Sequence, residues 1–383
     1  MQNDDKHINK INGRRQFLKN GMFAGCALCC GGFASPLFAE GKNKLWKWSK
    51  EAKYYSTEGK TTFCELCPQE CIIYPDKKGD CRTRINKNGK LYSLVYGNPC
   101  SVNVDPIEKK PLYHFLPKSS AFSIATAGCN LSCMNCQNWS ISQSAPEETR
   151  NMDLMPNQVV KAAQKYNCDS IAYTYSEPIV FYEYMYDSAK IAKEKGIKNV
   201  LITAGYINEK PLRDLCKVTD AANIDLKSFS DDIYKKLNGG TLKPVLRTLE
   251  ILTEENVWIE ITNLIVPGWT DDLKMIRKMC KWLVKSNLDE YPLHFSRFHP
   301  MYKLTHLPQT PISTLEKAVK IAKGEGMKYV YLGNVPGSNA ENTYCHKCSK
   351  LLIKRKGYYI LENNLENGKC KYCKVKIPGV WGE

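Results

Sequence analysis

Three cysteines in the middle of the chain, Cys129, Cys133 and Cys136, stand at the spacing C-x3-C-x2-C. Cysteine thiolates are the usual ligands of iron–sulfur clusters, and three of them on one loop can hold three irons of a [4Fe-4S] cube. A cluster that only stores electrons has every iron closed by a run such as C-x2-C-x2-C-x3-C-P, which is missing from this sequence. The spacing therefore predicts a cluster with one open iron; the alternatives are thiols that meet by chance or a zinc site without its last ligand.

An open iron can chelate the amino and carboxylate groups of S-adenosylmethionine. One electron from the cluster can then break a carbon–sulfur bond of the sulfonium and release a 5'-deoxyadenosyl radical, which abstracts hydrogen from a substrate. The loop at residues 128–139 (GCNLSCMNCQNW) resembles the cluster loop of the radical SAM superfamily.

The chain contains 18 cysteines, and two further groups of them include C-x2-C pairs. Such groups are typical of metal sites and not of a disulfide framework. The first group predicts a zinc ion closed by four thiolates, with a second iron–sulfur cluster as the alternative. The last group predicts a zinc ribbon. The two groups are Cys64, Cys67, Cys71 and Cys81, and Cys345, Cys348, Cys370 and Cys373.

The first 39 residues resemble a twin-arginine export signal. Residues 13–19 (GRRQFLK) are followed by an uncharged, glycine-rich stretch up to Ala39. This stretch is too weakly apolar and too interrupted for a spanning helix, so we expect no transmembrane segment beyond the signal. We expect a periplasmic or membrane-tethered protein; the alternative is a cytoplasmic one, because S-adenosylmethionine and low-potential electrons are supplied in the cytoplasm.

Strand-like and helix-like segments alternate along the rest of the chain. Repeated βα units predict an α/β fold built on a partial (β/α) barrel, in which sites gather at the C-terminal ends of the strands. The expected strands are 121–126, 170–174, 199–203, 222–226, 257–266, 293–298 and 329–332, and the expected helices are 179–195, 270–285 and 312–323. The predicted domains are the signal 1–39, a linker 40–60, a cysteine-rich N-terminal metal module 61–116, the barrel 117–338 and the zinc ribbon 339–383.

Polar residues follow several of the predicted strands. Glu177 lies in the segment TYSEP, Asp225 and Lys227 follow the strand 222–226, and His299 follows the strand 293–298. Each alone could be a surface pair or an ordinary loop histidine. Their shared position at the strand ends favours a functional role.

The formal net charge of +16 counts every thiol as neutral. Metal-bound thiolates would lower it to roughly +11. The remaining excess is spread along the chain, so nucleic acid is not the expected partner.

From about residue 54 to residue 381 the chain resembles the radical SAM enzyme of the AmmeMemoRadiSam system, a relative of the glycyl-radical-enzyme activating enzymes such as that of pyruvate formate-lyase. The resemblance implies that Cys129, Cys133 and Cys136 ligate the cluster. It places Glu177 at the methionine amino group and Asp225, Lys227 and His299 against methionine or ribose. The segments that carry it are CELCP at 64–68, DPIEKKPLYHF at 105–115, the loop 128–138, TYSEP at 174–178, FHPMY at 298–302 and the closing ribbon.

One position departs from the family pattern. The residue before the last cluster cysteine is usually aromatic and packs near adenine, and here it is Asn135.

The resemblance implies reductive cleavage of S-adenosylmethionine and hydrogen abstraction, with a protein glycine or another group of a partner protein as the substrate. It also implies protein partners of the same system and a low-potential electron donor. The alternatives are radical modification of RNA, or an electron-transfer protein with several clusters.

Overall fold

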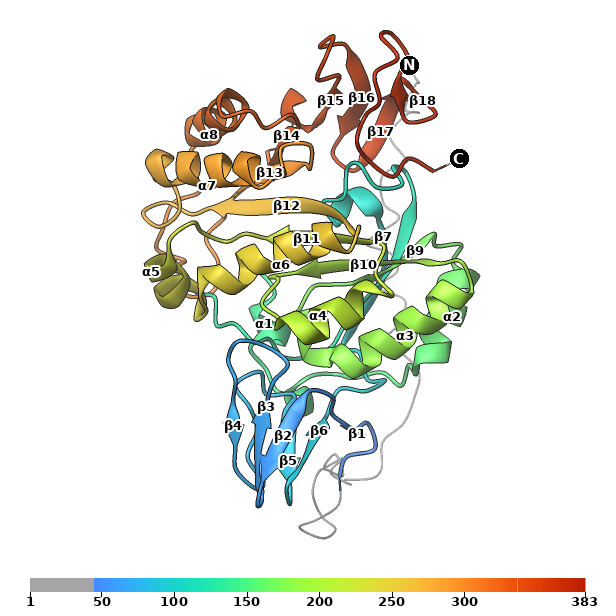
Figure 1. Ribbon diagram of the computed structural model, residues 1–383, viewed down its shortest axis with the longest axis vertical. Helices are drawn as coiled ribbons and strands as arrows, with labels where there is room; N and C mark the ends of the chain where they lie inside the picture. Colours follow the sequence, from blue (N-terminus) through green and yellow to red (C-terminus); the bar gives the residue numbers. More distant parts are fainter. Residues whose placement is uncertain (1–44, 336, 383) are drawn as a thin grey trace, which may run out of the picture. The chain divides into compact units, whose positions relative to one another are not determined.

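The computed structural model describes residues 45–335 and 337–382, so the predicted export signal lies outside the described residues. The centre of the described chain is an eight-stranded sheet with the order β14-β13-β12-β11-β10-β9-β8-β7 (Figure 1). Strands β8 to β14 run parallel, and β7 runs antiparallel to β8. The strands are β7 (Ser101–Pro106), β8 (Ser120–Ala125), β9 (Ser170–Tyr173), β10 (Lys198–Thr203), β11 (Ala221–Asp225), β12 (Trp258–Ile265), β13 (Leu293–Arg297) and β14 (Val330–Gly333).

The predicted α/β architecture with a mostly parallel sheet is confirmed. Each expected strand is present, and its ends agree with the prediction to within one residue. One boundary differs, because β7 belongs to the main sheet although residues 61–116 were expected to form the N-terminal module.

Helices connect the parallel strands in chain order. Because consecutive strands are neighbours and such crossovers share one hand, the connecting helices cover one face of the sheet; Figure 1 shows α3, α4 and α6 in front of the strands. Their apolar residues recur every three or four positions, as in the buried Ile276, Met279, Cys280 and Leu283 of α7. The helices are α1 (Trp139–Ser142), α2 (Pro156–Lys165), α3 (Tyr182–Glu194), α4 (Glu209–Cys216), α5 (Asp231–Ile233), α6 (Leu242–Glu254), α7 (Leu273–Lys285) and α8 (Ile312–Gly324).

Five short helical turns complete the connections. Turn η3 precedes α3 directly, which explains why the expected helix 179–195 begins as a 3-10 turn. Turn η4 is a π-helix that follows α5 without a break. The turns are η1 (Ile107–Lys109), η2 (Pro146–Glu148), η3 (Pro178–Phe181), η4 (Tyr234–Asn238) and η5 (Asn339–Glu341).

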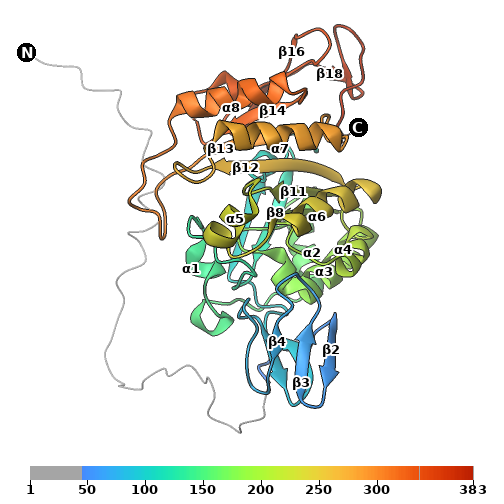
Figure 2. The same cartoon turned by 60° about the vertical axis from the view of Figure 1, so that its left-hand side comes forward.

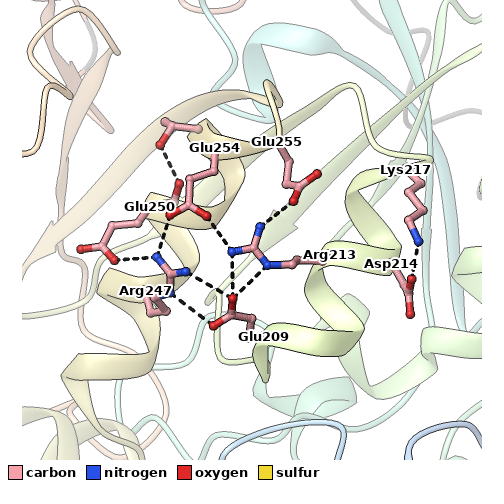
Figure 3. A network of polar contacts seen from close by, with 9 residues as sticks. Glu209, Arg213, Asp214, Lys217, Arg247, Glu250, Glu254 and Glu255 are labelled. Carbon is pink, nitrogen blue, oxygen red and sulfur yellow. Dashed lines mark hydrogen bonds and ion pairs between the residues drawn. The ribbon is translucent and has the colours of Figure 1, made fainter.

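An ion-pair network joins the outer surfaces of α4 and α6 (Figure 3). Arg213 contacts Glu209, Glu254 and Glu255, and Arg247 contacts Glu209 and Glu254. A single exposed pair contributes little, but a shared network of bidentate contacts holds the two helices in register.

The N-terminal module consists of two small sheets, β1-β6-β5 and β2-β3-β4. Two of these strands lie within residues 40–60, so the described part of the range predicted to be a linker is folded with the module. A fully buried ion pair, Arg84 Nη2 to Glu183 Oε1 at 2.5 Å, ties the module to α3. The strands are β1 (Lys50–Glu51), β2 (Tyr55–Glu58), β3 (Thr61–Cys64), β4 (Ile72–Ile73), β5 (Arg84–Lys87) and β6 (Lys90–Ser93).

The C-terminal module contains the sheets β15-β16-β17 and β18-β19. It packs on β14 through Tyr329, Tyr331, Leu352 and Ile353, and Arg355 Nη2 donates to the backbone oxygen of residue 113 at 2.9 Å. Figure 2 shows β16 and β18 at the opposite end of the main sheet from β2, β3 and β4. The strands are β15 (Thr343–Tyr344), β16 (Leu351–Lys356), β17 (Tyr359–Asn363), β18 (Leu365–Glu366) and β19 (Lys369–Cys370).

Within residues 45–335 and 337–382, no helix combines the length and the apolar character needed to cross a bilayer.

Gly128 marks a close approach between the N-terminal module and the loop after β8. Its φ of +94° is a conformation that favours glycine. A Cβ at this position would lie 2.5 Å from the carbonyl oxygen of Cys81 and closer still to the methyl group of Thr83. The absence of a side chain at Gly128 therefore lets the two segments touch.

We predict that Gly128→Ala destabilises the protein much more than Gly196→Ala. Gly196 also has a positive φ, but a Cβ there meets nothing within 4 Å, so that variant should lose only the backbone cost of about 1 to 2 kcal/mol. Gly128→Ala should lose a further amount of about 1 to 3 kcal/mol from overpacking. Anaerobic denaturant unfolding of both variants measures the difference, and equal losses would contradict the proposed close packing.

Candidate active site

The loop with the three central cysteines leaves the C-terminal end of β8. Its path is fixed by backbone hydrogen bonds to the end of η4: Ser132 N donates to Asn238 O at 2.8 Å, and Met134 N donates to Leu237 O at 2.9 Å. From the N-terminal module, Gln69 Nε2 donates to the backbone oxygens of residue 130 at 2.8 Å and of Gly239, which directly follows η4, at 2.9 Å. The loop is therefore held between the N-terminal module and a segment that follows β11.

The loop faces a cavity of about 1210 Å³ on the sheet. Side chains from the ends of β9 and β11 line the same cavity, as expected for the C-terminal ends of parallel strands. The structure brings together six of the residues predicted from the sequence: Cys129, Cys133, Cys136, Glu177, Asp225 and Lys227.

His299 does not join them. It is exposed and is not among the residues that line the cavity. Its neighbour Phe298 is buried against Leu237 and Leu304, and the chain turns so that the next side chain faces solvent. The predicted contact of His299 with the cofactor is therefore not supported by its position.

Burial and nearby hydrogen-bond donors act in opposite directions on the three thiols. Burial raises the pKa of Cys129, Cys133 and Cys136, so each thiol keeps its proton until a metal displaces it. Asn238 Nδ2 donates to Cys133 Sγ at 3.2 Å, and Leu131 N donates to Cys129 Sγ at 3.4 Å. Such hydrogen bonds stabilise the thiolate form and adjust the potential of a bound cluster.

Glu177 is buried at the start of η3. Its carboxylate accepts hydrogen bonds from Thr203 Oγ1 at 2.5 Å, Ala204 N at 2.9 Å and Ile179 N at 3.2 Å. Burial raises the pKa of Glu177 in spite of these donors. A carboxylate has about four acceptor positions, so one remains for a cationic group in the cavity.

Asp225 and Lys227 form an ion pair at the end of β11, with 2.8 Å between Oδ2 and Nζ. Burial acts to lower the pKa of Lys227, but the charge of Asp225 and its hydrogen bond to the ammonium group raise it above its ordinary value. Lys227 is therefore a fixed positive charge beside the sulfur of Cys133.

Unpartnered polar atoms show that the cavity is shaped for a polar group. Asn135 Oδ1, Ser176 Oγ and Asn238 Oδ1 are buried without a hydrogen-bond partner among the described residues. All three residues line the cavity. Buried acceptors without partners are costly in a folded protein. The residues therefore fit a cysteine-bound cluster together with a polar cofactor that carries donors.

A buried polar cluster beside the cavity was missed from the sequence. Lys109 and Lys110 place their Nζ atoms 2.7 and 2.6 Å from the two oxygens of Asp105, and the hydroxyl of Tyr175 also donates to Asp105. Tyr175 has a φ of +63°, and Asn138 Nδ2 donates to its backbone oxygen at 2.7 Å. A bulky residue in this strained conformation is characteristic of functional sites. The only sequence signal was the motif DPIEKK.

The C-terminal module supplies one wall of the cavity. The turn between β16 and β17 lines it with Lys356, Tyr358 and Tyr359, and Glu341 of η5 lies at the same wall. Tyr359 is 78% exposed. Large exposed aromatic side chains beside a cavity are typical of contact surfaces for other molecules. The sequence predicted a zinc ribbon as a separate domain but did not place it beside this cavity.

The two other cysteine groups are also assembled. All four ligand sulfurs of the C-terminal group, Cys345, Cys348, Cys370 and Cys373, lie within 4.8 Å of one another and could hold a metal ion. Cys64, Cys67, Cys71 and Cys81 line a second, smaller cavity beneath the loop.

Comparison with known proteins agrees with this site. Residues 123–283 match the Radical SAM superfamily. An uncharacterized protein of Methanocaldococcus jannaschii is 47% identical over 86% of this chain and 98% of its own length. The pyruvate formate-lyase 1-activating enzyme of Escherichia coli is 31% identical over 38% of this chain, and the match spans 61% of that enzyme.

A second activating enzyme matches over a longer range. The pyruvate formate-lyase-activating enzyme of Staphylococcus epidermidis is 25% identical over 56% of this chain and 90% of its own length. Among solved structures, a radical SAM methyltransferase from Sphaerobacter thermophilus aligns with a TM-score of 0.46 at 14% identity, over 57% of this chain and 67% of that one.

Proposed function

The chain belongs to the radical SAM superfamily and is an enzyme related to the pyruvate formate-lyase activating enzymes, and from this premise we propose that it cleaves S-adenosylmethionine at the Cys129 loop and abstracts hydrogen from a partner protein. The observation that carries the proposal is the single cavity in which three thiols meet Glu177, Asp225 and Lys227. Three thiolates would leave one iron open, and the carboxylates of Glu177 and Asp225 in the same cavity support binding of a cationic cofactor.

When bound, a [4Fe-4S] cluster and S-adenosylmethionine supply one-electron cleavage of a carbon–sulfur bond and a 5'-deoxyadenosyl radical. Cys129, Cys133 and Cys136 would hold three irons. The remaining acceptor position of Glu177 would receive the methionine ammonium group, and Asp225 would accept from the ribose hydroxyls. Asn238 would keep its hydrogen bond to the sulfur of Cys133 and so adjust the potential of the site.

The C-terminal wall of the cavity favours a protein substrate. The volume of about 1210 Å³ would be shared by the cluster, S-adenosylmethionine and the reacting group of the substrate. The exposed tyrosines of the β16–β17 turn could pack against a peptide segment that enters beside the cofactor.

We also propose the substrate group, the partners, the electron donor and the export route that the resemblance implies. The substrate would carry a glycine or another group that yields a hydrogen atom, and the enzyme would work with protein partners of the AmmeMemoRadiSam system. A low-potential one-electron donor would reduce the cluster. The first 39 residues would direct export by the twin-arginine route.

The C-terminal module would hold zinc. Tetrahedral zinc with Zn–S bonds of about 2.3 Å places its sulfurs about 3.8 Å apart. The distance from Cys345 Sγ to Cys373 Sγ is 3.6 Å, and that from Cys348 Sγ to Cys370 Sγ is 3.7 Å. This match supports a single zinc ion between the four thiolates.

The first prediction concerns the cofactor. Cys133→Ala should abolish 5'-deoxyadenosine formation under anaerobic conditions. Glu177→Ala and Asp225→Ala should keep full iron and sulfide content but lose a charged hydrogen bond, which costs about 1.5 to 3 kcal/mol. Binding of S-adenosylmethionine, measured by calorimetry, should weaken about tenfold to hundredfold.

His299→Ala is the matched control. Its side chain is exposed and outside the cavity, so binding and cleavage should equal those of the parent protein. If Glu177→Ala and Asp225→Ala also behaved as the parent, the cofactor would have to bind elsewhere.

The second prediction concerns the zinc. The full-length protein should contain zinc that is lost in Cys348→Ala and retained in His346→Ala, because His346 Nδ1 is engaged with the hydroxyl of Tyr329 at 2.7 Å. Metal analysis after purification measures both variants. Iron with sulfide in the C-terminal module, or equal zinc in both variants, would contradict the assignment.

The third prediction concerns export. Residues 1–45 fused to a folded reporter should direct it across the membrane, because the translocase recognises the paired arginines. The Arg14→Lys, Arg15→Lys double variant should remain in the cytoplasm. Cell fractionation compares the two fusions, and identical distributions would rule out a twin-arginine signal.

A further inference from the structure

The cysteines of the N-terminal module enclose a cavity of their own. Its lining includes the four thiols Cys64, Cys67, Cys71 and Cys81, and its volume is about 20 Å³, which is more than one water molecule needs. Cys64 and Cys67 are buried, and Cys71 and Cys81 are half-buried. The remaining lining is largely apolar, with Leu66, Ile73 and Val180 among its residues.

The spread of these sulfurs distinguishes the site from the C-terminal one. Of the residues that the structure describes, only the four ribbon cysteines bring three or more ligand atoms within 4.8 Å of one another. Zinc needs that compact arrangement, because all four sulfurs bind one ion. In a [4Fe-4S] cluster each thiolate binds a different iron, so the sulfurs stand further apart around a filled core. The N-terminal thiols, like those of the Cys129 loop, have the wider arrangement.

Arg84 gives the cavity a buried positive charge. Its side chain is 1% exposed, with Nη2 paired to Glu183 and Nη1 3.8 Å from Cys64 Sγ. Its Nε has no hydrogen-bond partner among the described residues, although Arg84 lines the cavity. A buried N–H without an acceptor is costly. A bridging sulfide of a cluster would provide an acceptor, and the guanidinium would offset part of the negative charge of the thiolates.

The second cavity lies directly beneath the Cys129 loop. Asn130 lines it, whereas the adjacent Cys129 and Leu131 line the large cavity. The backbone of Cys81 touches Gly128, because a Cβ there would lie 2.5 Å from the Cys81 oxygen. The two thiol sets are therefore separated by little more than one backbone segment.

We propose that Cys64, Cys67, Cys71 and Cys81 hold a second [4Fe-4S] cluster that passes single electrons to the cluster of the Cys129 loop. This replaces the zinc ion that the sequence favoured at this site. One electron enters from a low-potential protein donor of the ferredoxin or flavodoxin class and leaves to the first cluster; the donor is oxidised by one electron, and no proton or atom is transferred. The relay rests on the proposed function, because the first cluster is its acceptor.

The test compares variants of the full-length protein after anaerobic reconstitution with iron and sulfide. The parent should hold about eight irons and about eight sulfides, four of each per cluster. The double variant Cys67→Ala, Cys71→Ala should hold about half of the iron and half of the sulfide. Cys133→Ala should also hold about half and keep the Mössbauer and EPR signals of one reduced cluster. Cys100→Ala, which removes a thiol outside the three groups, should match the parent.

The relay is tested with two reductants. Dithionite reduces the cluster of the Cys129 loop directly. The double variant Cys67→Ala, Cys71→Ala should therefore form 5'-deoxyadenosine with dithionite at nearly the parent rate. With reduced flavodoxin, the same variant should be slower by about tenfold or more, because the entry point for the electron is gone.

Three results would overturn the inference. The first is an iron content of about four in the parent, together with zinc that the double variant Cys67→Ala, Cys71→Ala lacks. The second is a Cys133→Ala protein without any cluster signal. The third is a rate with reduced flavodoxin that is the same in the double variant as in the parent. If the parent formed no 5'-deoxyadenosine with either reductant, the proposed function would fail. The iron content and the spectra of Cys133→Ala would still decide whether the second cluster exists.

Discussion

The site depends on how the loop after β8 is held: two backbone segments from distant parts of the chain contact it. Gly128 lets the loop touch the backbone of Cys81. On the other side, Ser132 and Met134 donate to the backbone of η4, and a Cβ at Gly239 would collide with the side chain of Ser132. Because both contacts involve backbone, they fix where the thiols of the loop point before any metal binds.

The parallel sheet then decides which groups meet those thiols. The ends of β9 and β11 lie at the same edge as the end of β8, so Glu177 and the pair Asp225 and Lys227 reach one cavity. The charges are arranged with the positive group beside the sulfur of Cys133. The C-terminal module supplies one wall of the cavity with exposed tyrosines, so this module also shapes access to the reacting centre.

The N-terminal and C-terminal cysteine groups offer the same ligand atoms in different backbone geometries. In the C-terminal module the thiols converge on one point, with sulfur–sulfur distances of 3.6 and 3.7 Å. In the N-terminal module they surround a cavity, beside the buried guanidinium of Arg84. The two metals that we propose for these groups, one zinc ion and one cluster, rest on this difference in the path of the chain and in the charge placed next to the sulfurs.

The sequence by itself determined the features that depend on local spacing. The periodicity of apolar residues located the strands to within one residue, and the C-x3-C-x2-C spacing identified the loop, because neighbouring ligands on one loop need no distant contact. Only the tertiary structure decided the rest. The outward direction of His299, the hydrogen bond from Asn238 to Cys133 and the wall formed by Tyr359 all depend on contacts between remote segments. The spread of the N-terminal thiols was likewise hidden, because the order of cysteines along a chain does not fix the distance between their sulfurs in space.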